Sequence, residues 1–215
     1  MRDATGAALS GPVTASNGIV SLSLSSGAAP TVDAPVAFTV IVQGAGYLTT
    51  SAKVSISSAS GQAADIQLVA LTTDSSGNLT HTQPGVEGTV KVLGTVAGGQ
   101  VATVMSLSSP DVEDSSGNTV GGAGLSIPAG TTLRTATGAA AANGPVTASV
   151  VSFSSSSPTA LQAFPGGFAV TVGGSGPGTG TGVFTSGGFA AFNLTDAQGN
   201  ACLLYTSDAA DDSLR

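Results

Sequence analysis

The sequence is short of the residues that build disulfides, dense cores and charged surfaces. It has one cysteine, Cys202, and no tryptophan, and aromatic residues make up 4% of its 215 positions. One thiol excludes an intrachain disulfide framework and a cysteine-rich metal site. Charged residues make up 8%, against about 25% in ordinary soluble domains, so serine, threonine, asparagine and glycine must supply the polar surface. With 31 glycines and mostly small apolar side chains, the chain favours thin, wide β-structure over a compact α/β enzyme.

Positive charge and long apolar runs are also scarce. Five Lys and Arg residues stand against twelve Asp and Glu, a net charge of −7, which excludes the basic surface that nucleic acids or anionic membranes attract. No run of about 18 apolar residues is present, so we expect no membrane insertion in this segment. The residues from Met1 to Gly6 lack the apolar core of a signal peptide. If the protein is exported, we expect its start to lie upstream.

Residues 202–215 differ in composition from the Ser/Gly/Val-rich chain before them. The run from Cys202 to Asp212 resembles the in-frame translation of a transposase adapter that is used to prepare DNA sequencing libraries. We therefore interpret 202–215 as a non-native, adapter-derived tail and leave it out of the fold prediction. Without it the chain has no cysteine. The alternative is a genuine C-terminal strand that holds Cys202, Leu203 and Leu204.

An internal repeat with an offset near 131 residues organises the rest of the chain. Spaced glycine, proline and apolar positions recur in the same order, which short matches between low-complexity segments do not explain. The matching pairs are Ala4-Thr5-Gly6-Ala7-Ala8 with Ala136-Thr137-Gly138-Ala139-Ala140, Gly11-Pro12-Val13-Thr14-Ala15-Ser16 with Gly144-Pro145-Val146-Thr147-Ala148-Ser149, Ile19-Val20-Ser21-Leu22-Ser23 with Val150-Val151-Ser152-Phe153-Ser154, and Pro35, Phe38, Val40 and Val42 with Pro165, Phe168, Val170 and Val172. We predict a complete repeat over 1–133, a truncated second repeat over 134–201 and the tail over 202–215.

Alternating β-branched and polar residues predict strands in short runs that turn formers bound. The predicted strands are Ile19–Ser25, Val36–Val42, Lys53–Ser57, Ile66–Leu71, Thr89–Leu93 and Val101–Leu107. No segment has the capped apolar stripe of a helix. Six or seven strands in a unit of this size predict an all-β fold, a β-sandwich. A β-solenoid is the alternative, although its short period of about 20–30 residues is missing. The run from Gly173 to Gly182 is predicted to be a flexible loop.

Three turns share the pattern Asp-x-x-Gly-Asn: Asp74 to Asn78, Asp114 to Asn118 and Asp196 to Asn200. The first residue can accept hydrogen bonds from the amides of the turn, and glycine at the fourth position can take a positive φ. With these turns the chain resembles bacterial immunoglobulin-like tandem repeats of large surface proteins and adhesins. It also resembles a related repeat family in the run from Pro35 to Val40 and in the Ala97-Gly98-Gly99 step before Val101.

The resemblance implies that the sandwich is immunoglobulin-like. It also implies a non-catalytic spacer or adhesive module that is extracellular or displayed on a cell surface. Its partners would be neighbouring repeats or an unidentified surface ligand. We therefore expect a structural or adhesive repeat fragment of a large secreted protein, and no enzyme. The alternatives are a phage tail or decoration protein, and a spacer of an extracellular carbohydrate-active enzyme.

Few residues are candidates for chemistry, and we assign no catalytic, cofactor-binding or metal-binding residue. His81 is the only histidine and has no second histidine or cysteine to share a metal with, so we expect a surface residue. The acidic run from Asp111 to Asp114, with Asn118, is expected to be a solvated hairpin end, and calcium bound by these oxygen ligands is the alternative. The glycosylation patterns at Asn78 and Asn193 are not assigned as sites.

Overall fold

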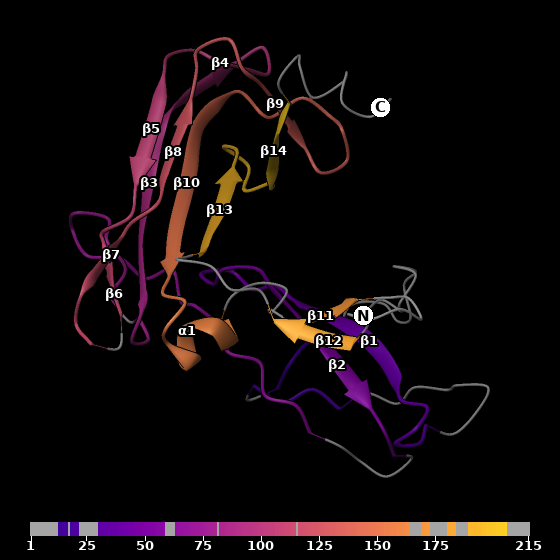
Figure 1. The fold of residues 1–215 in the computed structure, drawn as a ribbon. Coiled ribbons are helices and arrows are strands. Elements are labelled where there is room, and N and C mark those ends of the chain that lie inside the picture. The colour runs from indigo at the N-terminus through magenta and orange to yellow at the C-terminus, as the bar shows by residue number, and fades with distance from the viewer. Residues whose placement is uncertain are drawn as a thin grey trace. The chain divides into compact units, whose positions relative to one another are not determined.

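The structure is a computed structural model, and it describes residues 13–16, 18–21, 30–58, 63–80, 82–114, 116–163, 169–172, 180–183 and 189–205. The chain divides into two compact units. The first unit is Met1–Leu68 with Pro165–Val183, and the second is Val69–Phe164 with Phe184–Arg215. Every pairing between the named strands is antiparallel, and within the described residues one short helix accompanies the strands (Figure 1). The coarse prediction of an all-β fold is therefore confirmed.

The first unit contains two hairpins. Strand β1 (Val36–Val42) pairs with β2 (Thr50–Ile56), and β11 (Ala169–Val172) pairs with β12 (Gly180–Val183). The predicted strand at Val36–Val42 is confirmed to the residue, because its β-branched residues alternate cleanly. The predicted loop from Gly173 to Gly182 is wrong at its end, where Gly180 begins β12. Glycine keeps both backbone hydrogen-bonding groups, so it can form a ladder without side-chain packing.

The described strands of the second unit form one large sheet and two hairpins (Figure 1). The sheet has the order β13-β10-β3-β4-β9-β14, and β5 and β8 run alongside β3 and β10. The sheet strands are β3 (Val86–Ala97), β4 (Gln100–Val101), β9 (Thr132–Thr135), β10 (Gly144–Phe153), β13 (Phe189–Thr195) and β14 (Cys202–Tyr205). The hairpins pair β5 (Met105–Ser108) with β8 (Gly124–Ile127), and β6 (Val112–Glu113) with β7 (Thr119–Gly121).

Strand β10 lies at the centre of the core. Side chains on a strand point alternately to the two faces of the sheet. On one face Val146, Ala148 and Val150 belong to the apolar cluster that β5, β8 and β9 complete with Met105, Ile127 and Leu133. On the other face Val151 and Phe153 are also fully buried. Each aliphatic side chain removed from water in this way stabilises the fold by about 1.5–3 kcal/mol.

Two predicted strands differ from the structure in the second unit. Val101–Leu107 is divided, because Val101 ends β4 in the large sheet and Met105 begins β5 in the facing hairpin. Both side chains enter one core from different sheets, so the chain must cross between layers at residues 102–104.

No named strand forms over Ile66–Leu71, although Val69 is buried. In the first unit, Ile19 forms only an isolated bridge with Ser16, and the rest of the predicted strand lies partly outside the described residues.

The helix α1 (Pro158–Ala163) corrects the expectation that no helix forms. Ser157 caps its first turn, because the Ser157 Oγ accepts the Ala160 amide at 3.3 Å, and proline suits the first helical position. Ser157 also donates to the Pro84 carbonyl at 2.6 Å, and this bond ties the helix to the start of β3. The Ser-Pro pair is the signal that could have predicted this turn of helix.

The compact units are divided differently from the predicted repeats. The predicted boundary after residue 133 falls inside β9, and β10 of the predicted second repeat pairs with β3 of the first. Cys202–Tyr205, in the predicted tail, forms β14 on β9, while residues 206–215 lie outside the described residues. The repeat and the adapter origin of the tail stay predictions.

Met105 offers a direct test of the two-layer core. Its side chain is 1% exposed and lies against Gly94 of β3, whereas the neighbouring Val104 is 64% exposed. We expect Met105→Ala to lower the free energy of unfolding by about 2–5 kcal/mol, because the cavity lies between the sheets. Val104→Ala should change it by less than about 0.5 kcal/mol. Urea unfolding of both variants makes the comparison, and equal losses would contradict the layer assignment.

Candidate functional site

The three Asp-x-x-Gly-Asn turns have one geometry, as the sequence predicts. In each turn the first aspartate Oδ1 accepts the amides two and four residues later, at 2.8–3.0 Å. The glycine at the fourth position has φ of 88° at Gly77, 79° at Gly117 and 80° at Gly199. A positive φ is free of steric cost only for glycine. The aspartates therefore hold their own turns closed.

Asp196 is the most deeply placed of the three aspartates, at 4% exposed. Its Oδ2 also accepts the Ala142 amide at 2.9 Å and the Asn200 side-chain amide at 3.1 Å. Burial alone raises the pKa of Asp196, but the hydrogen bonds from Ala142, Asn200 and Gln198 outweigh burial and hold it below its usual value. Asp196 thus joins the β13–β14 turn to the segment before β10, and no sequence pattern indicates this long-range bond.

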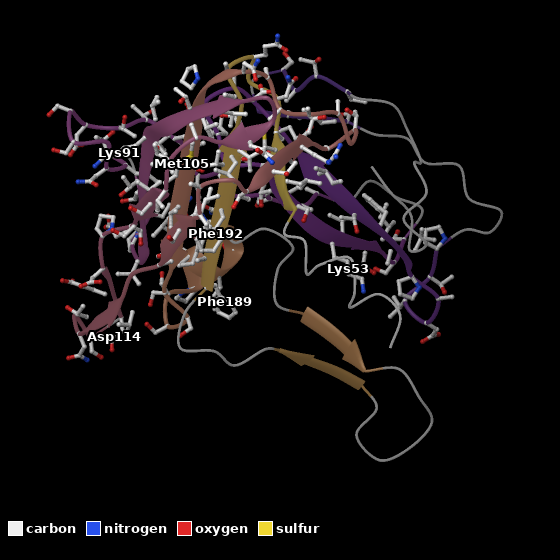
Figure 2. The ribbon with its side chains drawn as sticks, turned by 90° about the horizontal axis from the view of Figure 1, so that it is seen from above. Lys53, Lys91, Met105, Asp114, Phe189 and Phe192 are labelled. Carbon is white, nitrogen blue, oxygen red and sulfur yellow. The ribbon has the colours of Figure 1, made fainter. Side chains whose placement is uncertain are left out.

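The acidic run that could hold calcium is spread over the β6–β7 hairpin, and Asp114 lies at its far end (Figure 2). Asn118 donates from its side chain to the Asp114 Oδ2 at 3.0 Å, so both carboxylate oxygens serve the turn. The Asn118 side chain, with the Asn118 and Ser116 amides, lowers the pKa of Asp114. In the described part of the chain, no three His, Cys, Asp or Glu side chains converge on a point where a metal ion could bind.

An open hollow of about 470 Å³ lies between two turns of the second unit. One wall is the turn from Asp196 to Asn200. The other is the turn from Thr135 to Ala139, which has the same backbone bonds, with Gly138 at φ 85° and threonine in place of aspartate. Alanine methyl groups, threonine hydroxyls and side-chain amides line the rest of the hollow. Its one ionisable group is Asp196, whose oxygens are already occupied, so the hollow can offer a small ligand only weak polar contacts.

Several other polar groups of the second unit form hydrogen bonds within the fold. Ser109 and Ser152 share a buried 2.7 Å hydrogen bond, and the Ser109 Oγ also accepts the Ala123 amide at 3.0 Å, which joins β10 to the facing layer. Burial, with the nearby Asp196 charge, raises the pKa of the Cys202 thiol, so the thiol stays protonated at neutral pH. Asn78, in one glycosylation pattern, accepts a hydrogen bond from Thr89 at 3.1 Å, and Asn193, in the other, lies in β13. His81 lies outside the described residues.

Comparisons with known proteins find no matching family model, no matching curated protein and no matching solved structure. Among the described residues, none of the helices has the length and apolar character needed to cross a membrane.

Asp196 and Asp114 form a matched pair for testing the turn bonds. We expect Asp196→Ala to lower the free energy of unfolding by about 1–3 kcal/mol at pH 7, because the half-buried Ala142 amide loses its acceptor. Asp114→Ala should cost less, since Asp114 bonds only within its own exposed turn. Both carboxyls have lowered pKa values in the folded state, so their contribution is complete above the usual aspartate pKa and is lost as pH falls through the folded value. Urea unfolding from pH 7 to pH 2 checks both expectations, and a pH-independent difference would contradict them.

Ionised Glu87 of β3 should lower the stability of the fold at neutral pH, whereas the ionised turn aspartates raise it. Burial, and then the neighbouring Glu113 charge, raises the pKa of Glu87. A raised carboxyl pKa makes the ionised group a cost at neutral pH, and that cost disappears as pH falls to the usual glutamate value. We expect Glu87→Gln to raise the Tm at pH 7 and to leave it unchanged near pH 4.

Glu113→Gln is the control, because it removes only the repulsion and should give a smaller rise. A lowered Tm for Glu87→Gln at pH 7 would contradict the assigned cause.

Proposed function

We propose that the chain is a piece of a tandem array of immunoglobulin-like β-sandwich modules, with a structural or adhesive role and no catalysis. The observation that carries the proposal is the match between the two hairpins of the first unit. Val42 pairs with Thr50 in one hairpin and Val172 pairs with Gly180 in the other, and each position of the second lies 130 residues after its counterpart. The stretches of sequence between the paired strands, 43–49 and 173–179, are therefore equal in length. The two hairpins have the same register, and they are separated by nearly the same offset as the sequence repeat. Tandem copies of one module would produce this match.

The arrangement of the second unit is consistent with a sandwich. A large antiparallel sheet carries β5 and β8 against one face, and apolar side chains of both fill the space between them. Neighbouring sheets that interdigitate in this way are the basis of sandwich folds. The aspartates of the turns support a structural role, because their carboxylate oxygens accept hydrogen bonds from backbone amides of their own turns.

Composition supports a place outside the cell. The surface is rich in hydroxyl groups and poor in lysine, and the net charge of −7 discourages binding to nucleic acids. The partners we propose are neighbouring modules of the same protein and an unidentified surface ligand. Each module would set distance and stiffness for a binding element elsewhere in the protein.

Sequencing of the source DNA beyond codon 201, in both directions, tests the proposal. We expect the frame to continue with a counterpart of β3 and β5, followed by further copies at an offset near 131 residues. We also expect the codons for 202–215 to be absent from the genomic frame. A frame that encodes Cys202 to Arg215 and then stops, with one copy upstream, would refute the array.

Two other functions stay as alternatives, and the same sequencing separates them. A phage tail or decoration protein would have structural genes of a virion as neighbours. A spacer of an extracellular carbohydrate-active enzyme would have a catalytic domain with paired carboxylates farther along the frame.

A further inference from the structure

An apolar segment of the first unit is exposed to solvent. Its described residues are 13–16 and 18–21, and we call them the exposed segment. Val13 is 54% exposed, Ile19 71% and Val20 41%. Aliphatic side chains gathered in one short segment of this kind mark a surface that a partner covers.

The sequence repeat identifies the buried counterpart of the exposed segment. Val13 corresponds to Val146, and Ile19 and Val20 correspond to Val150 and Val151. These three counterparts lie in β10, and each is 0% exposed. Nearly the same sequence is therefore fully covered in one copy and open in the other.

The register of β10 shows which strand forms its longest ladder. Strand β3 pairs with β10 from Gly144 to Phe153, with Val150 opposite Thr89 and Val151 opposite Gly88. The fit is close at Gly88, where an added Cβ would lie 3.0 Å from the Val150 carbonyl oxygen and 3.1 Å from a Val151 methyl group. The absence of a side chain at Gly88 therefore lets β3 approach Val150 and Val151 closely.

The exposed segment differs from β10 by two extra residues, Asn17 and Gly18, between Ser16 and Ile19. There the Ser16 amide donates to the Ile19 carbonyl at 3.1 Å and the Ile19 amide donates to the Ser16 carbonyl at 2.9 Å, with Gly18 at φ 75°. Because side chains alternate with a period of two, two residues extruded from a strand leave the inward positions on either side unchanged. Opening the bridge between Ser16 and Ile19 breaks two backbone hydrogen bonds, and pairing with β3 would form a ladder as long as that of β10.

We propose that the exposed segment is a docking strand for the β3 edge of another copy of the repeat. Each sandwich would then form across a repeat junction, with β3 to β9 from one copy and the docking strand from the next. This inference rests on the tandem array proposed above and names the contact that joins its copies. The partner is specific, because the residues on either side of Asn17 and Gly18 match the β10 residues that pair with β3.

The test supplies the missing partner to the full chain. A second copy of residues 69–133 is placed before Arg2, which follows the order of Leu133 and Arg134 in the repeat. Hydrogen exchange, followed by mass spectrometry of peptides that cover residues 13–21, is compared between the original and the extended chain. We expect exchange in this segment to slow at least tenfold in the extended chain, while β10 stays protected in both. Unchanged exchange in the extended chain would overturn the proposal.

Two variants separate pairing from nonspecific protection. Val20→Asp should leave the Tm of the original chain unchanged, because Val20 is exposed there, and should abolish the new protection in the extended chain. Gly88→Val in the added copy alone should also abolish it, because the new side chain would meet both Leu79 of its own copy and the docking strand. Protection that survives both variants would refute pairing with β3.

The two proposals can fail separately. Source DNA that lacks further copies would remove the natural array, whereas the exchange result decides whether β3 recognises the exposed segment.

Discussion

The ladder between β10 and β3 is the interaction on which the second unit depends. It is the longest pairing in the described part of the chain, and it places β10 between β3 and β13 with both of its faces buried. One face closes on the β5–β8 layer, and on the other face Val151 and Phe153 are fully buried. A chain with few aromatic side chains gains most of its stability by covering valines completely, and this strand brings the largest number of them together.

The second constraint is the small number of charged residues. Each aspartate of the three turns accepts hydrogen bonds that hold its own turn. Asp74, Asp114 and Asp196 close their turns in one way, and Asp196 adds a bond to the amide of Ala142. Carboxylates that already accept several hydrogen bonds have little capacity left for a ligand. The hollow beside Asp196 is therefore best understood as the space between two turns of the same form.

The sequence predicted local features well and long-range features poorly. Strand β1 and the three aspartate turns were predictable because alternation and turn chemistry act over a few residues. Val101 to Leu107 also alternates, but the chain crosses between layers there, and only the packing of Val101 and Met105 on different sheets reveals the break. The pairing of β10 with β3 joins residues 48 (Gly144 and Val96) to 67 (Phe153 and Val86) positions apart, and it could not be predicted from either segment alone. The hollow was equally hidden, because Thr135 replaces the aspartate that marks the other turns.

Within this chain β3 pairs with β10, and not with the counterpart of β10 near the N-terminus. Nuclear Overhauser contacts across the strands measure this choice directly in solution. The register predicts contacts between Thr89 and Val150 and between Gly94 and Val146. Contacts from Thr89 or Gly94 to Ile19 or Val13 in their place would contradict the account, because the first-copy strand would then occupy β3.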